Sequence, residues 1–160
     1  MQRTQRLTMS GTECDAAGAR HLSDALANVL LPCNIHTLVL DNNPIGPDGA
    51  NYLAQAVKSA KRLVTLKMNN TGLGDSGAIA IFENLRGCPS LSTLELANNG
   101  IGDRAAGVIG NVLKDNETLT GLSLFKNALL ASGAQKIFTG IAINTTLQWL
   151  GLGGNPLGPD

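Results

Sequence analysis

The chain has 160 residues, 43% of them hydrophobic, so it is long enough and apolar enough to fold around a core. Its formal net charge is zero, which removes the electrostatic attraction that drives binding to nucleic acids or anionic membranes, and we expect neither as a partner. No apolar stretch approaches the roughly 20 residues that span a bilayer, and residues 1–10, MQRTQRLTMS, lack the apolar segment of a signal peptide.

A repeated unit with two halves of different period organises the whole chain. Each unit opens with an alternation such as Leu66–Lys67–Met68, which predicts a short strand with one buried face. The units begin at Leu7, Leu38, Leu66, Leu94, Leu122 and Leu150, with a first step of 31 residues and later steps of 28. The second halves predict amphipathic helices over residues 19–26, 50–57, 78–85, 106–113 and 134–141. Phe82 and Phe138 are expected on the buried faces of their helices.

Short connections between strand and helix predict that all strands run parallel, in an α/β fold. A unit of 28 residues cannot bury both of its apolar faces alone, but it can bury them against its neighbours. The sequence therefore predicts a stack of units in which each copy covers the next.

The motifs that carry the repeat are LVLDNNPIG, LKMNNTGLG, LELANNGIG, LSLFKNALL and LGLGGNPLG. Over about residues 4–160 they resemble leucine-rich repeats of the ribonuclease-inhibitor type. The resemblance implies a curved solenoid with parallel β-strands on the concave face and α-helices on the convex face. The same repeat type occurs in ribonuclease inhibitors, in NOD-like receptor sensor domains, in the Ran GTPase-activating protein and in several cytoskeletal regulators, so it implies the fold far more closely than the function.

We expect one domain over residues 1–160, with five full repeats and a terminal half repeat. The closing letters NPLGPD copy NPIGPD at residues 43–48, which there precede a predicted helix. This favours a fragment of a longer protein. The alternative is a native end covered by self-association, since terminal repeats of solenoids need shielding.

A column of asparagine and threonine residues follows the predicted strands. Its members are Thr12, Asn43, Thr71, Asn99, Asn127 and Asn155. Because these positions are flanked by apolar ones, the amides should be buried and bonded to the backbone of the turns. A hydroxyl offers fewer bonds than an amide, so we expect the Thr12 and Thr71 turns to be held less firmly. Asp48, Asp75 and Asp103 are candidate helix N-caps or first-turn acids.

Side chains that point away from the core should form a binding surface on the concave face. Its predicted members are Val39, Asp41, Lys67, Asn69, Glu95, Phe125, Lys126 and Trp149. Phe125 and Trp149 are outward aromatics on neighbouring strands, the type of residue that anchors protein interfaces. The competing interpretations are ordinary surface aromatics, or a Trp149 that covers an open end of the stack. Lys67 and Glu95 should pair across strands, with a charged hot spot as the alternative.

The sequence offers little for catalysis, and we expect no enzyme, no cofactor and no metal site. His21 and His36 lack a cysteine or carboxylate at zinc-ligand spacing, and no phosphate-binding loop is present. Three cysteines without the spacing of a disulfide framework favour a reducing, cytoplasmic compartment. Cys14 shares an apolar column and should be buried, whereas Cys33 and Cys88 fall in predicted loops and should be more exposed.

We interpret the chain as a non-catalytic scaffold that binds a protein partner through its concave face. The alternatives are a GTPase-activating regulator resembling the Ran-specific protein, or a structural segment of a cytoskeletal, ciliary or immune-receptor protein. Self-association through uncapped ends is a further option.

Overall fold

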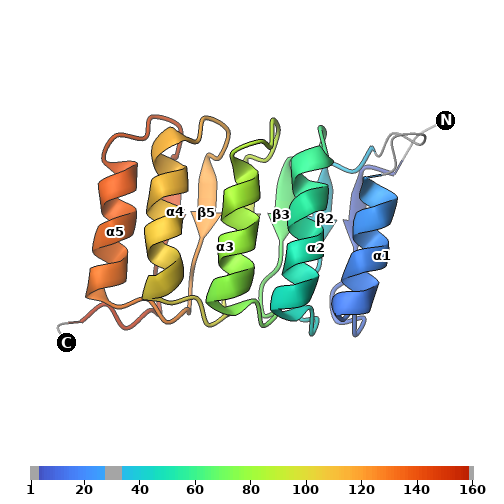
Figure 1. Cartoon of the computed structure of the whole chain (residues 1–160), viewed down its shortest axis with the longest axis horizontal. Helices are drawn as coiled ribbons and strands as arrows, with labels where there is room; N and C mark the ends of the chain where they lie inside the picture. The colour runs from blue at the N-terminus through green and yellow to red at the C-terminus, as the bar shows by residue number, and fades with distance from the viewer. Residues whose placement is uncertain (1–3, 28–33, 159–160) are drawn as a thin grey trace.

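The computed structural model describes residues 4–27 and 34–158 as alternating strands and helices. The strands are β1 (Arg6–Thr8), β2 (Thr37–Val39), β3 (Thr65–Lys67), β4 (Thr93–Glu95), β5 (Gly121–Ser123) and β6 (Trp149–Gly151). The helices are α1 (Ala16–Leu26), α2 (Gly46–Ser59), α3 (Gly74–Leu85), α4 (Asp103–Asp115) and α5 (Ala131–Ile141). The helices lie side by side in a row that covers one face of the strands (Figure 1).

The strands form one parallel sheet in chain order, from β1 to β6. The pairing aligns the central leucine of every strand with the central leucine of the next, from Leu7 to Leu150. The predicted parallel order therefore holds. The opposite face of the sheet carries no helix among the described residues (Figure 1).

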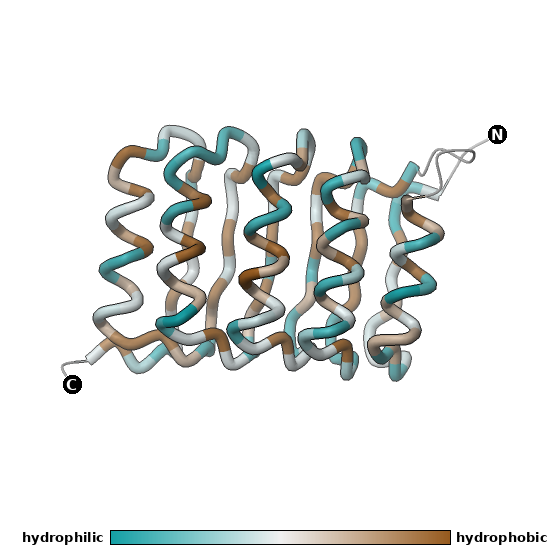
Figure 2. The backbone as a smooth tube through the Cα atoms, in the orientation of Figure 1, coloured by the Kyte–Doolittle hydropathy of each residue, from teal (hydrophilic) through white to brown (hydrophobic). Residues whose placement is uncertain are grey.

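The core fills the space between the sheet and the helices. Leu66 and Leu94 contribute to it from the strands, and Ile81 and Phe82 contribute from α3; all four are fully buried. Apolar positions recur along the helices and strands (Figure 2). Each internal unit thus buries its apolar face against both neighbours, as expected of a solenoid.

Glycines allow the helices to approach each other closely. A Cβ on Gly77 would lie 3.0 Å from the Ala50 Cβ of α2, at the limit of real contacts. Between α4 and α5 the contact is tighter, because a Cβ on Gly140 would lie 2.1 Å from the Gly110 carbonyl oxygen. Any larger residue at Gly110 or Gly140 would therefore push α5 away from α4.

Two of the predicted first-turn acids act on the following helix rather than on their own. The Asp75 carboxylate lies in the first turn of α3 but accepts the Gly102 N–H at 2.7 Å, at the start of α4. The Asp103 carboxylate, in the first turn of α4, accepts the Leu130 N–H at 2.9 Å and the Ser132 hydroxyl at the start of α5. Each acid joins two successive units.

Two expectations about burial are wrong. Cys88 is buried at 4% exposure, because the loop after α3 folds over the core, and Cys14 is buried as expected; Cys33 lies outside the described residues. Phe138 is 47% exposed although its helical period matches that of Phe82. The difference arises because no described helix lies beyond α5 (Figure 1).

Candidate protein-binding face

The turns after the strands all contain a left-handed residue at the same position of the repeat. These residues are Gly11, Asn42, Asn70, Asn98, Lys126 and Gly154, with φ between 51° and 75°. Glycine and asparagine tolerate this region best, so their recurrence here has a direct cause. The Asn70 amide donates to the Asn42 side-chain oxygen at 3.1 Å, and the Asn98 amide donates to Asn70 at 2.9 Å. An exposed ladder of amides therefore borders the sheet.

Beneath this border, the asparagine column binds the backbone of the preceding turn. The Asn99 side-chain oxygen accepts the N–H groups of Thr71 and Leu73 at 3.0 and 3.3 Å. Its amide donates to the Met68 carbonyl at 2.8 Å. Asn43 and Asn127 repeat this arrangement on the turn before each of them. The Asn155 oxygen accepts the Leu129 N–H, and its amide donates to the Leu124 carbonyl. The asparagine side chains thus connect each turn to the one before it.

Thr71 interrupts the column, but the weakened turn is not its own. The Asn99 side chain holds the Thr71 turn firmly, and the Thr71 hydroxyl donates to the Met68 carbonyl within its own unit at 2.8 Å. The preceding turn loses its amide, and the Ile45 N–H instead donates to the Asn43 carbonyl at 2.9 Å. The expectation that the Thr71 turn is held less firmly is therefore wrong. The turn that lacks a side-chain amide is the preceding one, which contains Asn43 and Ile45. Thr12 is likewise held by the Asn43 side chain.

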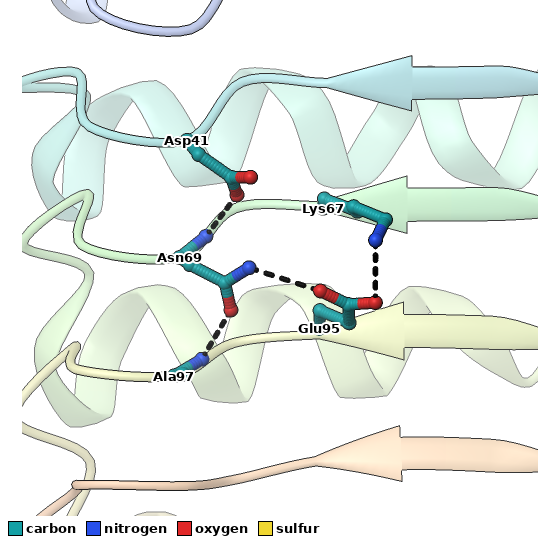
Figure 3. A network of polar contacts seen from close by, with 5 residues as sticks. All are labelled: Asp41, Lys67, Asn69, Glu95 and Ala97. Atoms are coloured by element: carbon teal, nitrogen blue, oxygen red, sulfur yellow. Dashed lines mark hydrogen bonds and ion pairs between the residues drawn. The ribbon is translucent and has the colours of Figure 1, made fainter.

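Four predicted surface residues form one polar network in the middle of the face (Figure 3). Lys67 and Glu95 form an ion pair at 2.8 Å, in agreement with their register. The second oxygen of Glu95 accepts the Asn69 amide at 3.1 Å. The Asp41 carboxylate accepts the Asn69 N–H, and the Asn69 oxygen accepts the Ala97 N–H, both at 2.7 Å. These side chains are half-buried and already engaged with each other, so this region is rigid and pre-organised.

Val39 differs from its predicted role. Its side chain is only 5% exposed although it stands outside the main core cluster. Thr8 and Lys67 flank it on the neighbouring strands. Val39 therefore offers little area to a partner.

The C-terminal part of the face has a different character. Phe125 is 43% exposed and Trp149 is 46% exposed. The indole of Trp149 lies over Gly121, because a Cβ on Gly121 would come within 2.2 Å of the indole nitrogen. The Phe125 ring lies beside Gly153, where a Cβ would stand 3.0 Å from the ring. Glycines thus form a floor on which two aromatic rings rest with one side open.

Lys126 completes this aromatic region. Its ammonium group lies 5.4 Å from the centre of the Phe125 ring, within the range of a cation–π contact. A partner that covers the rings would also meet one positive charge.

No group of three or more histidine, cysteine or acidic side chains in the described ranges is arranged to hold a metal ion.

The stacked units and their asparagine column define the fold as an α/β leucine-rich-repeat solenoid. A family model described as Leucine Rich repeat matches residues 32–54, 62–82 and 87–110, which contain β2 to β4 and much of α2 to α4. Among solved structures, 60 chains match. One is described as "Leiomodin-1 Actin-Binding Site 2 (ABS2)", with a TM-score of 0.72 and 20% identity over 87% of this chain and 79% of that one. No curated protein gave a significant sequence match.

Sequence reasoning missed that some polar residues of this face are favoured by the backbone conformation of the turns rather than by their side-chain contacts. Asn42, Asn70 and Asn98 lie in the turns after their strands, and their left-handed backbone is what favours asparagine there. The sequence did carry a signal for this left-handed position, because glycines occupy the same column in two other units.

No helix within the described residues is long and apolar enough to cross a membrane.

Proposed function

We propose that this domain is a non-catalytic, cytoplasmic scaffold that binds a protein partner through its concave face. The observation that carries the proposal is the pair Phe125 and Trp149, nearly half exposed on a floor of glycines. Large aromatics with few rotatable bonds give much contact area at low entropic cost and dominate measured interface energies.

The proposed site has two parts with different roles. The two aromatics and Lys126 supply the binding energy at the C-terminal end. The Asp41, Lys67, Asn69 and Glu95 network supplies a rigid polar surface whose side chains need not reorder on binding. We assign the repeats to the ribonuclease-inhibitor type, which the 28-residue period and the strand–helix unit support.

The test compares wild type with the double variant Phe125→Asp and Trp149→Asp in pull-downs and then with the purified partner. Both side chains are largely outside the core, so circular dichroism should show a folded variant. We expect affinity to fall by about 30-fold or more for each single substitution and further in the double variant, because truncating one anchor of a hot spot costs about 2 kcal/mol or more. Tyr52→Asp on α2 is the matched control, since Tyr52 is an exposed aromatic on the helical side. Unchanged affinity in the double variant, or an equal loss in the control, would place the site elsewhere.

A cytoskeletal partner is the second candidate, because the similar solved structure is described as an actin-binding site. At 20% identity this similarity supports the shared fold and does not identify the partner. Actin is therefore the first purified protein to test. Co-sedimentation of the chain with actin filaments, lost in the double variant, would support it. A GTPase-activating role is the remaining alternative, and GTP turnover by small GTPases in the presence of the chain would reveal it.

A further inference from the structure

Lys126 occupies a backbone conformation that suits its side chain poorly. Its φ of 51° lies in the left-handed region, at the repeat position that glycine or asparagine holds in the other described units. Glycine adopts this region without steric cost and asparagine tolerates it well, whereas the Cβ of a lysine crowds the following carbonyl oxygen. A residue kept in such a conformation against its own preference indicates a role beyond folding.

The same lysine ends the exposed ladder of amides. The Asn70 amide donates to Asn42 at 3.1 Å, and the Asn98 amide donates to Asn70 at 2.9 Å. Lys126 has no amide with which to continue the ladder to Asn98. An asparagine at position 126 would suit both the backbone and the ladder, so the lysine needs a different explanation.

The charge of Lys126 has no counter-charge within the proposed concave site. Lys67 and Glu95 neutralise each other at 2.8 Å, and the Asp41 carboxylate accepts the Asn69 N–H at 2.7 Å (Figure 3). Across residues 4–27 and 34–158 the pair of Lys67 with Glu95 is the only ion pair. No carboxylate of these residues therefore neutralises the Lys126 ammonium group.

This ammonium group lies beside an exposed apolar surface. It stands 5.4 Å from the centre of the Phe125 ring, which is 43% exposed. The lysine stem rests over Gly154, where a Cβ would come within 2.7 Å of the Lys126 Cγ. One positive charge and one open ring are thus presented together. A partner that covers the ring removes water around the charge, which strengthens its attraction for an opposite charge.

We propose that the partner of the concave face presents an acidic side chain next to an apolar one, with the carboxylate on Lys126 and the apolar group on Phe125. This inference rests on the proposed function and names the chemistry of the partner segment. A neutral or basic segment on the same ring would leave the ammonium group partly desolvated and without a counter-charge, which disfavours binding.

The experiment selects binders from a phage-displayed library of random peptides on the immobilised wild-type chain. We expect the selected peptides to be enriched in aspartate and glutamate beside large apolar residues. Synthetic copies should bind Lys126→Asn about three- to fivefold more weakly at low salt, the loss expected for one exposed ion pair. The difference should vanish in about 1 M salt, where charges are screened over about 3 Å.

Two further variants isolate the charge. Lys126→Glu keeps the same backbone requirement, and Glu13 shows that a glutamate occupies the left-handed region in this chain, at a φ of 58°. Selection on Lys126→Glu should enrich basic peptides instead of acidic ones. Lys61→Asn is the matched control, because Lys61 is an exposed lysine before β3, at the opposite edge of the sheet. It should keep the affinity for the acidic peptides.

The outcomes separate this inference from the proposed function. Peptides that lose affinity for Phe125→Ala but show no acidic bias, or that bind Lys126→Asn as well as wild type, would overturn the inference and leave the concave site in place. Peptides indifferent to Phe125→Ala, or no selected peptides, would overturn both.

Urea unfolding gives an independent measurement on the same variant. Lys126→Asn should unfold at the same urea concentration as wild type or at a higher one, because asparagine suits the left-handed backbone. A lower midpoint together with unchanged peptide affinity would show that Lys126 serves the fold, and would overturn the inference.

Discussion

Asp103 shows how one side chain can belong to one helix and stabilise the next. Its carboxylate accepts the Ser132 hydroxyl and the Leu130 N–H, where α5 begins. The hydrogen bond from Ser132, followed by the one from the Leu130 backbone, lowers the pKa of Asp103 below its usual value. The lowered pKa means that folding favours the ionised form of this carboxylate.

We predict that Asp103→Ala lowers the free energy of unfolding by about 1 kcal/mol at neutral pH, the usual cost of a lost helix cap. A folded-state pKa below the unfolded one gives stability that is present above the unfolded value and is lost as pH falls through the folded value. Urea titrations of wild type and variant should therefore converge in acid.

Asp48→Ala is the matched control for this prediction, because Asp48 is an exposed first-turn acid of α2. It should cost distinctly less than Asp103→Ala. A wild-type advantage at Asp103 that stays constant down to acid pH would show that the carboxylate charge is not what stabilises α5.

Burial of single residues was the least predictable quantity from sequence. The helical period placed Phe82 and Phe138 alike, yet only Phe82 has a helix on both sides. Cys88 looked like a loop residue, but the loop folds inward over the core. In each case the outcome depends on what lies next to the residue in space, which the local pattern does not contain.

At the scale of elements, the asparagine column sets how firmly each turn is held. The turn containing Asn43 and Ile45 lacks the amide that the other internal turns receive, because Thr71 is too short to supply it. The Ile45 N–H turns to the Asn43 carbonyl, just as the Leu157 N–H turns to the Asn155 carbonyl in the last described turn.

We predict that Thr71→Asn raises the free energy of unfolding by about 0.5–1 kcal/mol. The two side chains have similar volumes, and the new amide could keep the bond to the Met68 carbonyl while its oxygen accepts the Ile45 N–H. Thermal and urea unfolding would measure the gain.

Thr12→Asn is the control for this substitution. In the described part of the chain no turn precedes Thr12, so an amide there has nothing to bridge, and stability should stay within about 0.5 kcal/mol of wild type. A loss of stability in Thr71→Asn would mean that the buried site cannot orient the amide.

Most of the elements themselves could be predicted from sequence, because both periods are strong. The helical stripe at residues 106–113 lies within α4, and the alternation at Leu94 lies in β4. What sequence could not give is the bonding between units, such as the Asp75 contact to Gly102. That contact joins residues 27 positions apart, and its geometry depends on the spacing of two helices.

At the scale of the whole molecule, each unit touches only its neighbours, so stability should vary along the stack. We predict that amide hydrogen exchange is slowest at Leu66 and Leu94, which have strands on both sides, and faster at Leu7 and Leu150 at the two edges of the sheet. Exchange measured by mass spectrometry in dilute solution would test this gradient. Uniform protection from β1 to β6 would show instead that the chain opens only as one unit.

The glycine contact between α4 and α5 has a consequence for the curvature of the solenoid. Strands pair at about 4.8 Å, whereas helices usually pack 8–10 Å apart, and this difference bends a solenoid toward its sheet. Where Gly140 rests on the Gly110 carbonyl, the outer arc shortens and the bend decreases. The sheet should therefore be flatter between β4 and β5, the strands that precede α4 and α5. A broad, gently convex partner could therefore lie over these two strands and reach the exposed Phe125 ring, which follows β5.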